Sequence, residues 1–191
     1  MISGMHPQQR WLLTLNVLGG IGVLGSYIVG LATHPGTGDF LWGGVPQALK
    51  PFYNITMLSA AAGYFPFTFL LLYRTDARST RIAGRYGFGW FLLLYALILI
   101  PSALWLPLTL SLLEGWDPAL WLTIRVVLGL VGIGSLGLLA ALLTLSPVTS
   151  RRLHKLAIAG AVAFCMQTAL LDATIWPAYF PRGTSATVRV P

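Results

Sequence analysis

Charged residues are scarce in this 191-residue sequence: they make up 9% of it, whereas hydrophobic residues make up 56%. A soluble globular domain carries about a quarter charged residues, so the composition excludes one. There is also a single cysteine, which excludes a scaffold held together by disulfide bonds. The composition therefore predicts one membrane domain that comprises residues 1–191.

Residue types that carry chemistry are also few. The three histidines, His6, His34 and His154, fall outside the long apolar runs, and no lysine lies inside one. No zinc or iron–sulfur ligand spacing is present, and neither is a phosphate-binding or dinucleotide-binding glycine motif. We therefore expect no cofactor and no metal. No nucleophile–base pair is visible either, so we predict no catalytic residues, and an enzyme is the least favoured class.

The apolar runs are continuous rather than alternating, which favours helices over a transmembrane barrel. A helix needs about 20 apolar residues to cross the hydrocarbon core of a bilayer. Five runs meet this length: residues 11–32, 52–73, 88–113, 118–145 and 156–176. The sequence thus predicts an all-α fold, a polytopic membrane protein built as a bundle of five transmembrane helices. The predicted connections are an outer loop at 33–50, a basic inner loop at 74–87 and a short outer tail at 180–191.

The net charge of +7 is distributed unevenly over this topology. If the N-terminus is cytoplasmic, the inside carries one anion, Asp76, and a set of cations: Arg10, Arg74, Arg78, Arg81, Arg85, Arg151, Arg152 and Lys155. The outside is balanced, with Lys50, Arg182 and Arg189 against Asp39, Glu114 and Asp117. This is the pattern of the positive-inside rule. We therefore expect an integral protein of a bacterial inner (cytoplasmic) membrane, with a cytoplasmic N-terminus and the C-terminus outside. Because topology accounts for the charge, we predict no nucleic-acid partner.

Small residues recur along some helix faces. Gly22, Ser26 and Gly30 repeat every four residues in the first helix, and Gly129 and Gly132 recur in the fourth. Small residues let helix backbones approach closely in a membrane. Packing inside the bundle is the simplest interpretation, and a docking face for another membrane protein is the alternative.

Two charges, Arg125 and Asp172, lie inside predicted helices on such faces. At about 1.5 Å per residue, Arg125 lies about 10 Å from the helix start at Pro118, and Asp172 about 7.5 Å from the helix end at Pro177. In adjacent antiparallel helices the two charges lie at similar depth, in the outer half. An unpaired charge in hydrocarbon costs several kcal/mol, so we predict that they contact each other directly or through one water. A structural ion pair and a ligand site are both open interpretations.

Further polar side chains are predicted near these charges. The candidate ligand-binding residues are Arg125, Asp172, Tyr53, Asn54, Thr56, Ser102, Trp105, Thr109, Gln167 and Thr168. Aromatic walls with few polar groups suit an amphipathic small molecule or a lipid, and Arg125 suits an anionic one. Core packing of the same aromatic residues is the alternative.

In size, helix count and tryptophan content the chain resembles the translocator-protein family; no residue roles are carried over from this resemblance. The residues favour binding or transport of a small amphipathic or anionic, lipid-like ligand in an outer-half pocket. The alternative is a non-catalytic structural or assembly subunit of a larger membrane complex. The expected partners are membrane lipid and an amphipathic small molecule, with a homo-oligomer or larger complex left open. A closed bundle with a polar cavity favours the binder, whereas exposed small-residue stripes favour the subunit.

Overall fold

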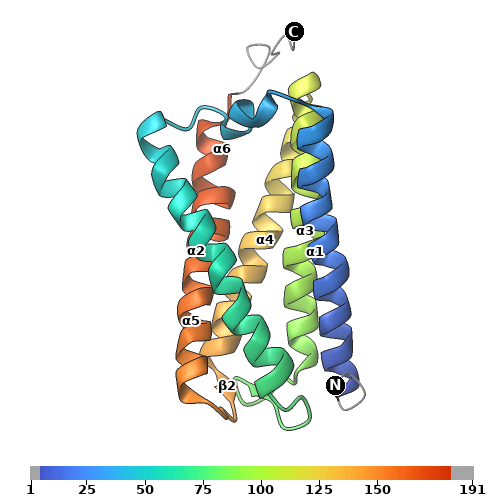
Figure 1. The fold of residues 1–191 in the computed structure, drawn as a ribbon, viewed down its shortest axis with the longest axis vertical. Coiled ribbons are helices and arrows are strands. Elements are labelled where there is room, and N and C mark those ends of the chain that lie inside the picture. Colours follow the sequence, from blue (N-terminus) through green and yellow to red (C-terminus); the bar gives the residue numbers. More distant parts are fainter. Residues whose placement is uncertain (1–4, 182–191) are drawn as a thin grey trace.

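The computed structural model describes residues 5–181 as a bundle of long helices (Figure 1). The long helices are α1 (Pro7–Thr33), α2 (Lys50–Phe69), α3 (Gly89–Glu114), α4 (Pro118–Leu143) and α5 (Arg151–Cys165). Two π-helical segments continue helices: η4 (Leu70–Arg74) continues α2, and η5 (Met166–Ile175) continues α5. The short helix α6 (Trp176–Tyr179) follows η5. Five of the resulting spans are long and apolar enough to cross a membrane. The predicted all-α, five-helix fold is confirmed. Most of the predicted tail, residues 182–191, lies outside the described residues.

Local capping chemistry sets where the helices begin. Asp117 precedes Pro118, and its carboxylate accepts a hydrogen bond from the backbone N–H of Ala119 at 2.8 Å. This satisfies one of the free N–H groups at a helix start. His6 plays the same part for α1, since its ring accepts from the backbone N–H of Gln8. The first helix therefore begins at Pro7, a few residues before the apolar run does.

The long helices pack against one another in the order α1, α3, α4, α5 and α2. α1 lies against α3, α3 against α4, α4 against α5 and η5, and α5 against α2. α1 also contacts η4, the continuation of α2, at the end of the bundle that carries the N-terminus (Figure 1). We call this end the basic end and the opposite one the distal end. The distal end carries the connection between α1 and α2, which includes two short 3-10 helices, η2 (Thr37–Trp42) and η3 (Gln47–Leu49).

Glycines lie where helices come close to one another. A Cβ atom on Gly30 of α1 would lie 2.9 Å from the side chains of Leu106 and Leu110 of α3. A Cβ on Gly132 of α4 would lie 3.2 Å from the backbone of Ala169 in η5. These glycines therefore serve packing inside the bundle, as their spacing indicated.

The basic end is a compact set of short connections. Strands β1 (Arg81–Ile82) and β2 (Leu145–Ser146) pair there and join the α2–α3 and α4–α5 connections. Asp76 accepts hydrogen bonds from the backbone N–H of Arg78 at 3.0 Å and from the Ser79 hydroxyl at 2.9 Å. These bonds, the backbone one first, hold the pKa of Asp76 below its usual range. Their contribution to stability is therefore present above the unfolded-state pKa and is lost as the pH falls through the folded-state value.

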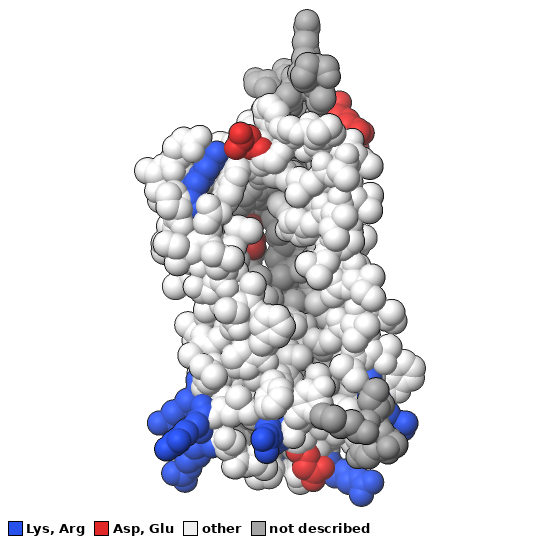
Figure 2. Space-filling view, viewed as in Figure 1, with Lys and Arg blue, Asp and Glu red and all other residues white. Residues whose placement is uncertain are grey.

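Basic side chains gather at this end (Figure 2). The exposed cations there are Arg10, Arg74, Arg78, Arg81, Arg85, Arg151, Arg152 and Lys155. At the distal end Lys50 pairs with Asp39 at 3.8 Å, and His34 contacts Glu114 at 3.2 Å. The described part of the chain thus carries eight of its ten lysines and arginines at one end.

This asymmetry gives a testable topology. By the positive-inside rule we expect the basic end to face the cytoplasm. An odd number of the five spans separates Arg81 from the C-terminus, so reporters fused at these two places are expected to lie in opposite compartments, with Arg81 inside. Paired alkaline phosphatase and fluorescent-protein fusions measure this. Finding both fusion sites in one compartment would contradict a five-span topology.

Candidate functional site

A cavity of about 490 Å³ lies in the distal half of the bundle. It is lined by Val23, Tyr27, Leu31, Gly38, Leu41, Trp42, Tyr53, Met57, Ala60, Ala61, Ser102, Trp105, Leu128, Val131, Phe164, Gln167, Thr168, Asp172 and Trp176. Figure 2 shows the corresponding hollow in the side of the molecule, with an acidic side chain at its floor. The one acidic residue in the lining is Asp172. This size is typical of sites for small organic molecules.

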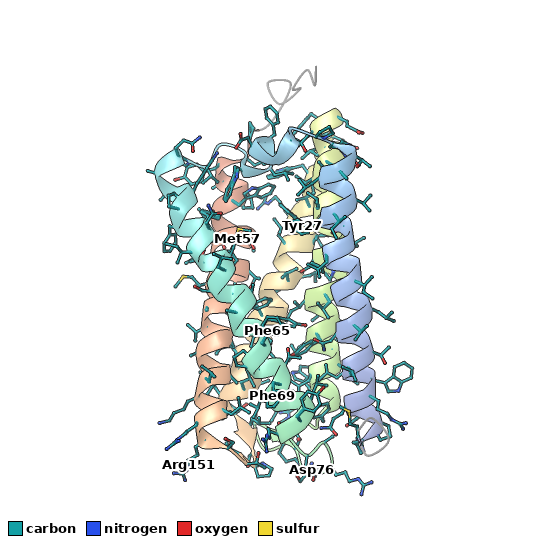
Figure 3. All side chains as sticks on the ribbon, in the orientation of Figure 1. Tyr27, Met57, Phe65, Phe69, Asp76 and Arg151 are labelled. Carbon is teal, nitrogen blue, oxygen red and sulfur yellow. The ribbon has the colours of Figure 1, made fainter. Side chains whose placement is uncertain are left out.

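The cavity opens sideways, between α1 and α2. The two helices diverge toward the distal end, and Tyr27 of α1 and Met57 of α2 lie on the two sides of the opening (Figure 3). The outward faces of both helices carry exposed apolar residues, among them Leu24, Ile28 and Leu58. In a membrane, these faces contact lipid tails, so the opening faces the hydrocarbon rather than the aqueous end of the bundle.

Aromatic side chains close the cavity toward the basic end. Phe164, in the cavity wall, packs against Tyr64 and Phe67, with ring centroids 5.9 and 5.8 Å apart. Tyr95 joins this group and is fully buried. The hydroxyl of Tyr64 donates a hydrogen bond of 2.6 Å to Asn16 of α1, which ties α1 to α2 at this depth. The cavity is therefore a dead-end pocket and not a passage through the bundle.

The connection between α1 and α2 covers the cavity at the distal end. Leu41 and Trp42 of η2 are in the lining. The indole N–H of Trp176 donates a hydrogen bond of 2.9 Å to the carbonyl of Leu41, and the backbone N–H of Gly44 donates to the carbonyl of Tyr179 at 3.1 Å. These bonds hold the cover onto α6, so the lateral opening is the way in.

The polar wall of the cavity is built by the π-helical segment η5. The amide Nε2 of Gln167 donates to Oδ1 of Asp172 at 2.7 Å, a pair five residues apart. In an α-helix residues five apart point in directions that differ by about 140°, whereas the wider π-helical turn aligns them. The hydroxyl of Thr56 in α2 contacts Oε1 of Gln167 at 2.7 Å and fixes its orientation. The result is a buried chain from Thr56 through Gln167 to the carboxylate.

Several polar groups of the lining are left without partners. The indole Nε1 of Trp105 is buried and has no hydrogen-bond partner in residues 5–181. Within the same described range, the hydroxyls of Tyr27 and Ser102 make no hydrogen bonds, and Asp172 accepts one only from Gln167. Buried polar atoms in proteins are nearly always satisfied by protein, water or ligand. The Trp105 indole N–H is therefore a buried group that a bound molecule or water would satisfy, whereas the free oxygens of Tyr27, Ser102 and Asp172 are open to the cavity.

The predicted site residues fall into two groups. Six of them line the cavity: Tyr53, Ser102, Trp105, Gln167, Thr168 and Asp172. The other four do not line it. Thr56 stands behind Gln167, and Thr109 is buried with its hydroxyl donating to the Trp105 carbonyl at 2.8 Å. Asn54 and Arg125 are exposed on the outer face of the bundle.

Contact between Arg125 and Asp172 was predicted to be direct or through one water, and the direct form is wrong. Among residues 5–181 no salt bridge joins them. On this face of α4 a Cβ at Gly132 would meet η5, whereas a Cβ at Gly129 would meet nothing within 4 Å. Arg125 itself is exposed, whereas its neighbours Ile124 and Leu128 are buried and Trp121 packs against Trp176, so the arginine lies at the outward edge of this helix face. The arginine projects into the surroundings of the bundle, while Asp172 faces the cavity on its other side.

Sequence reasoning missed a large part of the aromatic wall. Tyr27 on α1, Trp42 in η2 and Trp176 at the start of α6 all line the cavity. The spacing of Val23, Tyr27 and Leu31, four residues apart, was the available signal, since it places them on one face of α1. For Trp42 no local pattern distinguished a cavity residue from an interfacial anchor.

In the described part of the chain, no group of three or more His, Cys, Asp or Glu residues could hold a metal ion. Comparison with known proteins finds no family model, no curated protein and no solved structure that matches the chain.

Proposed function

We propose that the protein binds a small amphipathic molecule in the distal cavity and takes it up from the membrane through the gap between α1 and α2. One observation carries this proposal: an aromatic cavity of about 490 Å³ opens through the side of an apolar bundle and contains unpartnered polar atoms. An amphipathic molecule partitions into the membrane, so it reaches a lateral opening at high local concentration. On the topology expected from the charges, the cavity lies in the outer leaflet.

The shape of the cavity favours binding over permeation. Tyr64, Phe67 and Tyr95 separate it from the basic end, and the latter two are fully buried. A permeation path would need this aromatic group to move. The anionic ligand considered from the sequence depended on Arg125, which does not line the cavity. The proposal therefore excludes an anionic ligand.

The role of a complex subunit depended on exposed small-residue stripes. Gly30 of α1 and Gly132 of α4 instead contact other helices of the same chain, whereas a Cβ on Gly129 would meet nothing within 4 Å. One open glycine does not make an exposed stripe, so the subunit role is kept as an outcome of the experiment below.

Blocking the opening tests the proposal. Ala61 lines the cavity and is exposed at its opening, whereas the adjacent Ala62 is exposed but does not line it. Ala61→Trp and Ala62→Trp add the same side chain to the same helix, so they form a matched pair. We expect Ala61→Trp to weaken binding of a nitroxide-labelled octanol at least about tenfold, equivalent to about 1.4 kcal/mol. Ala62→Trp is expected to bind as the wild type does.

Saturable quenching of tryptophan fluorescence in lipid nanodiscs measures the affinity, and Trp105 and Trp176 report from the cavity wall. Native mass spectrometry after mild extraction identifies copurified molecules in the same three proteins. Equal affinity in all three would contradict binding in this cavity. Copurified protein partners without a cavity-dependent small molecule would favour the subunit role.

A further inference from the structure

We infer that the bound molecule carries a positively charged headgroup, a protonated amine or a quaternary ammonium, which sits between the Asp172 carboxylate and the aromatic wall, with the apolar chain directed toward the opening. This inference deepens the proposed function and depends on it. The juxtaposition that carries it is a single acidic side chain among six aromatic ones in a cavity that opens toward lipid.

Charge is the first argument. Asp172 is the only charged residue in the lining. Its protein partner is the neutral amide of Gln167, at 2.7 Å, and the other carboxylate oxygen has no hydrogen bond in the described residues. A carboxylate inside a membrane span is costly unless a cation or water compensates it. Because no salt bridge supplies a protein cation, a ligand cation is the compensating partner of fitting chemistry.

The aromatic wall is the second and independent argument. Trp105 packs edge-on against Trp176 at 5.8 Å between ring centroids, and its ring is tilted by 33° against that of Tyr27 at 6.0 Å. Trp42 and Tyr53 pair at 5.9 Å on the α2 side of the same cavity. Cations bind over the faces of such rings, and groups of aromatic rings are the usual recognition site for quaternary ammonium groups. Simple burial of an apolar chain needs no such concentration of tryptophan and tyrosine.

The surrounding charges do not oppose a cation. Lys50, the first residue of α2, lies 5.6 Å from the centroid of the Trp42 ring and pairs with Asp39 at 3.8 Å. Neither of them lines the cavity. Arg125 projects outside the bundle and is exposed. A bound cation therefore faces one anion and no unpaired lysine or arginine within the cavity.

A neutral alcohol is the competing ligand, because it can donate a hydrogen bond to Asp172 just as an ammonium group does. Three nitroxide-labelled probes with the same eight-carbon chain separate the classes: one ends in trimethylammonium, one in a hydroxyl and one in a carboxylate. Nanodiscs of zwitterionic lipid keep the surface potential from biasing their local concentrations. In the wild type we expect the ammonium probe to bind at least about tenfold more tightly than the alcohol, and the carboxylate to bind most weakly.

The variant Asp172→Asn removes the charge with little change of shape and keeps an oxygen for the Gln167 amide. We expect it to bind the ammonium probe no better than the alcohol, with the alcohol affinity changed less than about twofold. Arg125→Gln is the matched control, because it removes a charge at similar depth outside the cavity and is expected to keep the wild-type preference.

The outcomes separate the inference from the proposed function. Equal binding of ammonium and alcohol by the wild type, or an ammonium preference that survives in Asp172→Asn, would overturn the cationic headgroup and leave the cavity as a binding site. Absence of saturable binding by all three probes would overturn the proposed function itself. If Asp172→Asn does not fold, the three wild-type affinities alone decide the headgroup.

Discussion

A Gly63→Ala variant is expected to be less stable than the wild type by at least about 2 kcal/mol, because α2 and α5 touch backbone to backbone at this position. A Cβ atom on Gly63 would lie 2.6 Å from the carbonyl oxygen and 2.7 Å from the Cα of Gly160. Neither atom belongs to a flexible side chain, so the helices must separate to admit the methyl group. Separation there also disturbs the hydrogen bond of 2.7 Å between Thr56 and Gln167.

The matched control for this variant is Gly129→Ala. A Cβ on Gly129 of α4 would meet nothing within 4 Å. Alanine is the better helix former, so we expect this variant to be unchanged or more stable, by up to about 1 kcal/mol. Denaturant unfolding in bicelles gives both free energies of unfolding. If Gly63→Ala were as stable as Gly129→Ala, the two helices would not be in backbone contact at Gly63.

Helix faces were predictable wherever packing follows the α-helical period. In α2 the spacing of Tyr53, Thr56, Ala60 and Gly63 places them on one face, and all of them are buried. The same period applies to α5, where Ala157, Ala161 and Cys165 are buried. The reason is physical: side chains three and four residues apart lie on one side of an α-helix, whatever it packs against.

The polar wall was less predictable because the helix changes its period there. The α-helical spacing placed Thr168 and Asp172 on one face, but it gave no reason for Gln167 to bond to Asp172. That contact needs the π-helical turn of η5. The sequence carries no clear sign of the change, because a π-helical turn is decided by the balance of packing and hydrogen bonds over the whole segment.

The direct contact of Arg125 with Asp172 was mispredicted for a different reason. Contact depends on the direction in which a side chain leaves its helix as well as on its position along the helix. α4 packs against Trp176 through Trp121, and Ile124 is buried, but Arg125 is exposed. Which edge of a helix face is covered depends on how the helices are assembled, and a single-helix pattern does not contain this information.

A Gln9→Leu variant is expected to lose about 2 kcal/mol of stability, because it removes the amide that joins α1 to η4 at the basic end. The Nε2 atom of Gln9 lies 3.0 Å from the carbonyl oxygen of Leu72 and 2.9 Å from that of Thr75, with the Leu71 carbonyl at 3.4 Å. These carbonyls end a π-helical segment and have no further turn of helix to bond to. Leucine is of similar size but donates nothing, so buried acceptors are left unsatisfied.

Gln8→Leu is the matched control, because it makes the same substitution at the neighbouring position. The Gln8 side chain makes no hydrogen bond within residues 5–181. It is expected to change the free energy of unfolding by less than about 0.5 kcal/mol. Hydrogen exchange locates the effect: amides of residues 70–75 should exchange faster in Gln9→Leu and at the wild-type rate in Gln8→Leu.

The hydrogen bonds of Gln9 also lie where α1 contacts η4, the continuation of α2. A loosened basic end would let α1 move relative to α2, so the lateral opening should widen and octanol-probe exchange should be faster in Gln9→Leu. Unchanged hydrogen exchange at residues 70–75 would mean that the cover and the α1–α3 contact hold α1 in place without this amide.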